Sequence, residues 1–413
     1  MPSVCLYFQV HQPYRLRKLF YLDSNPEWDY FDEDLNRRIT EEAAERGYLP
    51  ANRLMLALIK RFRGKFKISY SISGTALEQL CRYAPAVLES FRTLASTGCV
   101  EFLGETYYHS FASVFDEAEF VEQVEHHRRV MRETFGITPT VFRNTDLLYS
   151  DRIGLVVERL GFKGILVQAV DYVLGWRSPN YLYGAEGAGV GLLVRNAQLS
   201  DDVAVRFSNR EWVEFPLSAD KYASWISNID GSGDIVNIFL GYDAFGERHS
   251  AESGIFEFME HFPAALLKRK QWSFCTPSEA LARYDRVGRL SYPLLTSWTD
   301  LGCDTGAWLG SGLQGLALAE LYRISSLVRG AGNARLLDVW RKLQSSDHFH
   351  YMHTAWYGAP QSQISPFANP HDGYIYYMNT LRDFTGSVRQ TTGAGKEFVT
   401  YPEALRVKAV ANS

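Results

Sequence analysis

Short apolar runs alternate with helical stretches over the first 285 residues of the chain. Several runs are almost continuously apolar, which is typical of parallel strands that are covered on both faces. The runs are residues 4–10, 66–72, 99–104, 140–144, 164–169, 190–196, 235–241 and 272–276. Apolar periodicity between them predicts helices, for example over 77–94, 117–135 and 150–160. This strand–helix alternation predicts an α/β fold with a parallel barrel of seven or eight strands.

The stretch 117–135 carries clear signals at both ends. Asp116 stands where an N-cap is expected, and Gly136 follows the last helical position, where a helix commonly ends. An open, doubly wound sheet is the competing arrangement for alternating strands and helices. No GxGxxG or GxxxxGK[ST] loop follows any predicted strand, so the pattern favours the barrel.

The pattern becomes helical from about residue 286 onward. Helical periodicity covers residues 312–330, 334–346 and 374–390. We therefore expect two domains, a barrel over residues 1–285 and a C-terminal helical bundle over residues 286–413.

Charge and cysteine usage narrow the class of protein. The 413 residues include 43 Lys+Arg and 47 Asp+Glu, with no long run of one sign, so nothing marks a nucleic-acid partner. Five scattered cysteines with no CxxC pair fit a reducing compartment. The apolar N-terminal run is short and lacks a basic segment before it, and no run approaches the ~18 apolar residues of a spanning helix. We expect a cytoplasmic protein without a membrane partner.

Aromatic residues are unusually frequent, with 24 Tyr, 25 Phe and 9 Trp. Because Tyr and Trp carry a polar edge, this excess suits either a wide aromatic cleft or a large core. Polar residues follow several predicted strands, where barrel enzymes place their active sites. These residues are His11, Glu105, His109, Arg143, Asp146, Asp171 and Asp243.

Carboxylates, histidines and aromatic rings at one barrel mouth suit a sugar-binding cleft, and paired carboxylates are the usual device of glycosidases. A metal site is the alternative for His and Asp at a barrel mouth. The adjacent pair His126–His127 lies inside a predicted helix, where neighbours point about 100° apart, so we expect no metal there.

Several long motifs extend along nearly the whole chain. They are FQVHQPYRLR (8–17), VEFLGETYYHS (100–110), PTVFRNTDLLYSD (139–151), GFKGILVQAVDYVLGWRSPNYLY (161–183), LSDDVAVRFSNREW (199–212), FLGYDAFGERHSAESGIFEFMEHFP (239–263), TSWTDLGCDTGAWLG (296–310) and SSDHFHYM (345–352). With these motifs the chain resembles glycoside hydrolase family 57, specifically its α-amylase-like branch. The resemblance implies an incomplete TIM-like (β/α)7 barrel, a C-terminal helical region and retaining action on α-glucans, with no metal or organic cofactor.

Two departures fall on the positions that do the chemistry in that family. The family's nucleophile is the Glu of an FRNTE-like segment, where this chain has Asp146. The family's acid/base is an Asp four residues before the Phe of a DYETFGE-like segment, which corresponds here to Gly241. Asp243, two residues further along, is the candidate substitute acid, although a supporting role in substrate binding is the simpler interpretation.

The strand ends and the resemblance together give a set of expected sugar contacts. They are His11, Glu105, His109, Arg143, Asp171, Trp176, Tyr242, Trp298 and Asp300. We expect an α-1,4-glucan or maltooligosaccharide ligand and hydrolase activity that is weak or lost. One alternative is an active retaining hydrolase or glucanotransferase that uses Asp146 with a displaced acid such as Asp243. Another is a non-enzymatic scaffold that binds a protein through its aromatic surface.

Overall fold

The protein consists of two compact units. The computed structural model describes residues 1–413 except 26, 230, 299–301, 355–364 and 394–413. The first unit contains residues 1–13 and 33–305, and the second contains residues 14–32 and 306–413.

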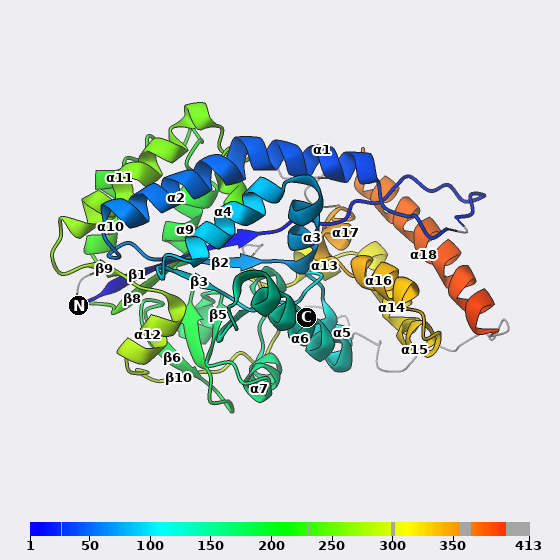
Figure 1. The fold of residues 1–413 in the computed structure, drawn as a ribbon. Coiled ribbons are helices and arrows are strands. Elements are labelled where there is room, and N and C mark those ends of the chain that lie inside the picture. Colours follow the sequence, from blue (N-terminus) through cyan, green and yellow to red (C-terminus); the bar gives the residue numbers. More distant parts are fainter. Residues whose placement is uncertain (26, 230, 299–301, 355–364, 394–413) are drawn as a thin grey trace. The chain divides into compact units, whose positions relative to one another are not determined.

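Seven parallel strands form a closed ring in the described part of the first unit. Figure 1 labels β1, β2, β3, β5 and β8 of this ring. Ladders join β3–β2–β1–β8 and β7–β5–β4. Two bridges close the ring, Gly104–Phe142 between the β3 end and β4, and Arg195–Asn237 between the β7 end and β8. The strands are β1 (Ser3–Val10), β2 (Ile68–Ile72), β3 (Val100–Phe102), β4 (Val141–Arg143), β5 (Gly164–Val167), β7 (Gly191–Val194) and β8 (Ile235–Gly241). The expected (β/α)7 barrel is confirmed.

Three short strands stand outside this ring. β6 (Leu182–Ala185) pairs antiparallel with β7, and β10 (Arg289–Leu290) pairs with β6. β9 (Ser273–Phe274), within the last predicted run, pairs only with the start of β1.

Helices follow most of the barrel strands. They are α1 (Glu33–Ala43), α2 (Leu49–Arg61), α3 (Gly74–Tyr83), α4 (Pro85–Ala95), α5 (Ala112–Phe115), α6 (Glu117–Phe135), α7 (Asp151–Arg159), α8 (Asp171–Leu174), α9 (Ala197–Ala204), α10 (Ala219–Ser227), α11 (Ile255–Leu267) and α12 (Pro277–Arg283). A five-residue π-helical segment, Ala44–Tyr48, joins α1 to α2.

The burial of β1 explains why its sequence is apolar almost throughout. Val4, Leu6 and Phe8 pack into the core that the helices cover, whereas Cys5 and Tyr7 belong to a second cluster with residues from other strands of the ring. Since successive side chains of a strand point to opposite faces, both faces of β1 are buried.

Local sequence sets the helix ends. The carboxylate of Asp116 accepts a hydrogen bond from the amide of Glu119 (3.0 Å), and Gly136 ends α6 with φ 69°, as the sequence predicts. The single helix expected over 77–94 is instead two helices, because Pro85 begins a new one and the residue before a proline disfavours helical geometry.

The second unit is helical. Its helices are α13 (Gly306–Leu309), α14 (Gly312–Arg323), α15 (Ser325–Gly330), α16 (Ala334–Lys342), α17 (Ser346–His350) and α18 (Pro370–Thr392). Residues 14–32 join this unit through α18, where Asp383 accepts hydrogen bonds from the Tyr30 hydroxyl (2.7 Å) and the Asn25 amide (3.1 Å). The helices in the described part of the chain are all too short or too polar to cross a membrane.

The division of the chain differs from the boundary expected at residues 285 and 286. Residues 286–305 remain with the barrel, because β10 pairs with β6 and Thr296 bridges to Tyr149. Residues 14–32 leave the barrel unit although both of their neighbouring segments belong to it. Sequence periodicity shows neither contact, since both join segments that are far apart in the chain.

Gly74, at the start of α3, allows the close approach of the loop that follows β3. A Cβ at Gly74 would lie 2.3 Å from the ring of Tyr107. We expect Gly74→Ala to lower the free energy of unfolding by about 1–3 kcal/mol, because the ring must shift in a packed interior. Gly315→Ala in α14, where a Cβ meets nothing within 4 Å, is the matched control. Equal unfolding midpoints of the two variants in urea would contradict the expected packing.

Candidate functional site at the carboxyl ends of the strands

Four of the predicted residues gather beyond the ends of β3 and β4. His109 lies at the centre of this group, with its Nδ1 3.6 Å from Oε2 of Glu105 and its Nε2 3.6 Å from Oδ2 of Asp146. Arg143, the last residue of β4, places Nη1 3.9 Å from the same Glu105 oxygen. Glu105, His109 and Arg143 are almost fully buried, and Asp146 is 8% exposed. This ionic cluster is consistent with the predicted position of the site.

The charges of the cluster change the protonation of its members. Burial alone lowers the pKa of His109, but the carboxylates of Asp146 and Glu105 outweigh burial and raise it to about 9. Burial raises the pKa of Glu105, and the opposing effects of His109, His127 and Arg143 leave it below its ordinary value. At neutral pH the carboxylates therefore favour an imidazolium at position 109.

Arg143 extends across the inside of the barrel. Its Nη2 donates a hydrogen bond to Oε1 of Gln9 on β1 (2.8 Å), and its guanidinium carbon lies 4.8 Å from the centre of the Phe239 ring on β8. The other end of the Gln9 amide, Nε2, lies 3.2 Å from Nε2 of His109. Arg143 therefore contacts Glu105 and Gln9 directly and acts on Asp146 through its charge.

Asp146 lies in a turn that fixes its backbone. Its φ and ψ angles are 49° and 33°, in the left-handed region, which Asp adopts more readily than most residues. Asn144 caps this turn by accepting from the amide of Thr145 (3.0 Å) and donating to the carbonyl of Leu148 (3.0 Å). The hydroxyl of Ser297 donates to the carbonyl of Asp146 itself (2.7 Å). These bonds hold the carboxylate in place beside His109.

His11 follows the end of β1 and joins the same group. Its Nδ1 lies 2.7 Å from the hydroxyl of Ser73, and its ring centre lies 4.1 Å from that of His109. His11 and Gln9 are both half-exposed, so they lie between the buried ionic cluster and solvent.

The position of the family's acid/base, at the end of β8, is a glycine and offers no side chain. Gly241 is the register partner of Gln9 on β1. The carboxylate of Asp243 accepts from Nη2 (2.9 Å) and Nε (3.3 Å) of Arg248, and this pairing raises the pKa of Arg248. Arg248 therefore occupies the carboxylate of Asp243, the candidate substitute acid.

Tyr242 is the predicted contact that the structure places away from the site. Its side chain is fully buried among the helices outside the ring, and its hydroxyl bonds Asn52 (2.6 Å) and Tyr70 (3.2 Å). The residue lies next to Gly241, but the strand ends there and its ring turns toward the helices. We therefore remove Tyr242 from the expected sugar contacts.

The remaining predicted residues lie on other segments. Asp171 begins α8, and Trp176 follows that helix with 95% of its surface exposed. Trp298 packs edge-on against Phe239, with their ring centres 5.5 Å apart, and directly follows Ser297. Asp300 lies outside the described residues.

Two residues that the sequence analysis did not select belong to the cluster. Gln9 bonds both Arg143 and His109, and its position two residues before His11, on the same face of the strand, could have indicated it. His127 on α6 accepts from the amide of Glu105 (3.4 Å), and its Nε2 lies 2.8 Å from the carbonyl of Ile72. Burial lowers the pKa of His127, so this ring is a neutral support for the Glu105 backbone.

The described residues contain no group of three or more His, Cys, Asp or Glu that could hold a metal ion. His126 stacks on Tyr107, with ring centres 4.0 Å apart, whereas its neighbour His127 points to Glu105. The two neighbouring histidines thus point to different residues, Tyr107 and Glu105.

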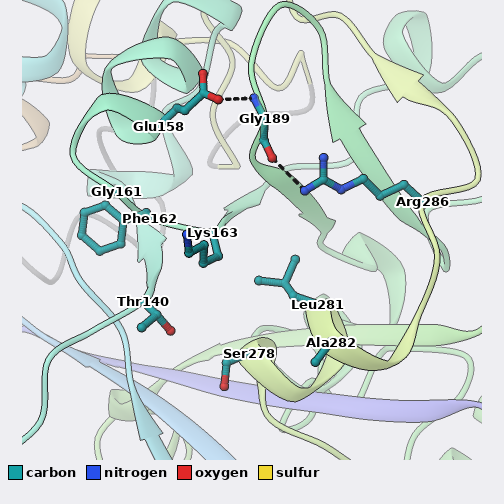
Figure 2. Close-up of a pocket in the computed structure, with 10 residues that line it drawn as sticks. All are labelled: Thr140, Glu158, Gly161, Phe162, Lys163, Gly189, Ser278, Leu281, Ala282 and Arg286. Atoms are coloured by element: carbon teal, nitrogen blue, oxygen red, sulfur yellow. Dashed lines mark hydrogen bonds between the residues drawn. The ribbon is translucent and has the colours of Figure 1, made fainter.

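A cavity of about 450 Å³ lies among the segments that lead into β4, β5 and β7 (Figure 2). Figure 2 shows Arg286 donating to the carbonyl of Gly189 (2.7 Å), while Glu158 accepts from the amide of the same residue (2.8 Å). The predicted site residues do not line this cavity, which lies toward the amino ends of the strands. Barrel enzymes place their chemistry at the carboxyl ends, so we do not assign the cavity to the site.

A seven-stranded barrel with an ionic cluster at its carboxyl edge is the architecture that the resemblance to a glycoside hydrolase family implies. The family model described as glycosyl hydrolase family 57 matches residues 5–293. A relative from Methanocaldococcus jannaschii, named "Putative alpha-amylase", is 37% identical over 397 residues, which are 93% of this chain and 84% of the relative. The chain belongs to glycosyl hydrolase family 57.

Solved structures share the fold at low identity. The 4-alpha-glucanotransferase from Thermococcus litoralis has a TM-score of 0.69 at 14% identity, covering 94% of this chain. A branching enzyme of this family from Thermococcus kodakaraensis has a TM-score of 0.68 at 14% identity, covering 98% of this chain and 93% of its own. The chain spans 60% of the length of the glucanotransferase, so that enzyme supports the fold and not an activity.

Proposed function

We propose that the chain is an α-amylase-like member of family 57 that binds α-1,4-glucan at the carboxyl ends of its strands and has little or no hydrolase activity. One observation carries the proposal: the acid/base position at the end of β8 is Gly241, and the nearby Asp243 is paired with Arg248. Losing a positioned general acid typically costs ~10²–10⁴ in rate.

The length of the Asp146 side chain and its contact with His109 support the same proposal. In the family a Glu is the nucleophile, and Asp146 is shorter by one methylene, which withdraws the carboxylate by roughly 1 Å and can cost ~10²-fold. Its carboxylate also faces His109 at 3.6 Å, where the cationic ring favours a paired, less nucleophilic oxygen. Gln9 and His11 are half-exposed, so a sugar can reach this edge of the cluster. The scattered cysteines support a role in the cytoplasm.

The first test is binding without turnover. We expect maltoheptaose to raise the melting temperature of the protein, and we expect no products after long incubation. No shift in melting temperature would count against a glucan site. Product formation that disappears in Asp146→Ala would favour the active hydrolase or transferase instead.

His11 is expected to contribute directly to glucan binding. We expect His11→Ala to weaken maltoheptaose binding about tenfold, the loss of roughly one good hydrogen bond. The measurement is isothermal titration calorimetry. His261→Ala is the matched control, because that exposed histidine on α11 bonds only its own helix, at the carbonyl of Glu257 (2.8 Å). Equal affinities in the two variants would remove His11 from the site.

A further inference from the structure

Gln9 lies between Arg143 and His109. Its Oε1 is 2.8 Å from Arg143 Nη2, and its Nε2 is 3.2 Å from His109 Nε2. A guanidinium can only donate hydrogen bonds, so the amide atom that faces Arg143 must be the oxygen. Arg143 therefore fixes which way the Gln9 amide points.

The fixed orientation of the Gln9 amide determines which of its atoms faces Nε2 of His109. With the oxygen turned to Arg143, Gln9 presents an N–H to Nε2 of His109, and this nitrogen must accept. An imidazole that accepts at Nε2 is neutral and carries its proton on Nδ1, which faces Glu105 at 3.6 Å. The protonated ring would instead direct an N–H at the Gln9 amide, and one of the two groups would have to move.

We propose that Gln9 is a positioning residue that presents an amide N–H to His109 and so favours the neutral imidazole against the two carboxylates. Four charged or titratable groups face His109. They are Glu105 beyond the end of β3, Arg143 at the end of β4, Asp146 in the turn that follows β4, and His11 beyond the end of β1. His127 of α6 acts on His109 through Glu105. The carboxylates favour the cation, and burial, the positive charge of Arg143 and the Gln9 amide oppose it. Gln9 differs from the other groups because its amide does not titrate.

The consequence concerns the sugar site and rests on the proposed function. When His109 is protonated, its Nε2 carries an N–H that opposes the Gln9 N–H, and the ring has to turn this N–H toward the Asp146 carboxylate. When His109 is neutral, its Nε2 makes no such hydrogen bond to Asp146, and the carboxylate can accept hydrogen bonds from sugar hydroxyls instead. Gln9 thus increases the fraction of molecules in which the strand-end carboxylate is available to a glucan.

The test is a titration of His109 by NMR in the natural chain, in two Gln9 variants and in a control variant. Gln9→Met keeps a similar volume and removes the amide, and we expect it to raise the pKa of His109 by about half a unit to one unit, the scale of one neutral hydrogen bond. Gln9→Glu replaces the donor with a carboxylate, and we expect a larger rise. Loss of packing alone would not place the two variants in this order.

Gln168→Met is the matched control, because Gln168 also accepts from a buried arginine, Arg195 (3.2 Å), without touching His109. We expect it to leave the His109 titration unchanged. An unchanged or lowered pKa in both Gln9 variants would overturn the proposal, as would an equal rise in the control.

Glucan binding gives a second, separate readout. The pH midpoint of maltoheptaose affinity should move upward with the His109 pKa in Gln9→Met. If no glucan binds at any pH, the proposed function fails while the NMR titration still decides the role of Gln9. A midpoint that stays in place while the pKa moves would show that His109 does not control access to Asp146.

Discussion

Rebuilding the catalytic pair should create an enzyme. We expect Asp146→Glu combined with Gly241→Asp to hydrolyse maltoheptaose at least ~10²-fold faster than the natural chain, because the first change restores the reach of the nucleophile and the second restores a general acid. The expected gain is the largest effect that any substitution in the chain is predicted to have on activity.

The structure shows an obstacle to the second change. A Cβ at Gly241 would lie 2.1 Å from Oδ1 of Asp243, and Arg248 holds that carboxylate through its other oxygen. A side chain at position 241 therefore has to displace a fixed neighbour. We expect the triple variant that adds Asp243→Ala to be more active than the double variant.

The matched control replaces Gly241→Asp with Gly241→Asn in the same triple variant. Asparagine has the same shape but cannot act as the acid, so the control should lose the gain and still bind maltoheptaose. The measurement is the release of reducing ends at pH 6–7. A triple variant no faster than its asparagine control, although it binds glucan, would mean that the site has lost more than two side chains.

The barrel strands could be predicted because strands that are buried on both faces are apolar almost throughout. All eight predicted runs contain a strand, and the helix over 117–135 has the bounds of α6. β6 was missed because it follows a polar, turn-rich segment, residues 176–181, and is only four residues long. The two-residue β10 depends on pairing with β6, which no local pattern reveals.

The sequence could indicate which strand ends carry the residues of the ionic cluster, but not how those residues contact one another. Alternation places Gln9 with His11, but the role of Gln9 depends on an arginine from β4 that crosses the barrel. The left-handed backbone of Asp146 follows from several hydrogen bonds at once, including one from Ser297, 151 residues away. Such contacts depend on the closure of the ring, and spacing in the sequence does not encode them.

Removing the buried carboxylate of Glu105 is expected to have the largest effect on stability. The Glu105 side chain is fully buried and lies 3.6 Å from His109 and 3.9 Å from Arg143. Glu105→Gln leaves these cations without their common partner, and breaking a buried pair in this way costs about 3 kcal/mol. We expect that loss in urea unfolding at pH 6, where the native cluster is fully charged.

The pH dependence of the loss distinguishes this ionic effect from a packing defect. Because the folded pKa of His109, about 9, lies above its ordinary value of 6.5, its contribution to the free energy of unfolding is complete below pH 6.5. The contribution disappears as the pH rises from 6.5 to about 9. In Glu105→Gln the pKa of His109 falls toward its ordinary value, so the variant should lose less stability over that interval than the natural chain does.

Glu101→Gln is the matched control, because Glu101 is a half-buried barrel carboxylate that bonds the amide and hydroxyl of Ser278 (2.9 Å each) and not His109. Burial raises the pKa of Glu101 above its ordinary value. We expect this control to keep the full alkaline decline. If Glu105→Gln also keeps that decline unchanged, His109 is not stabilised as a cation by Glu105, and the ionic account of the cluster is wrong.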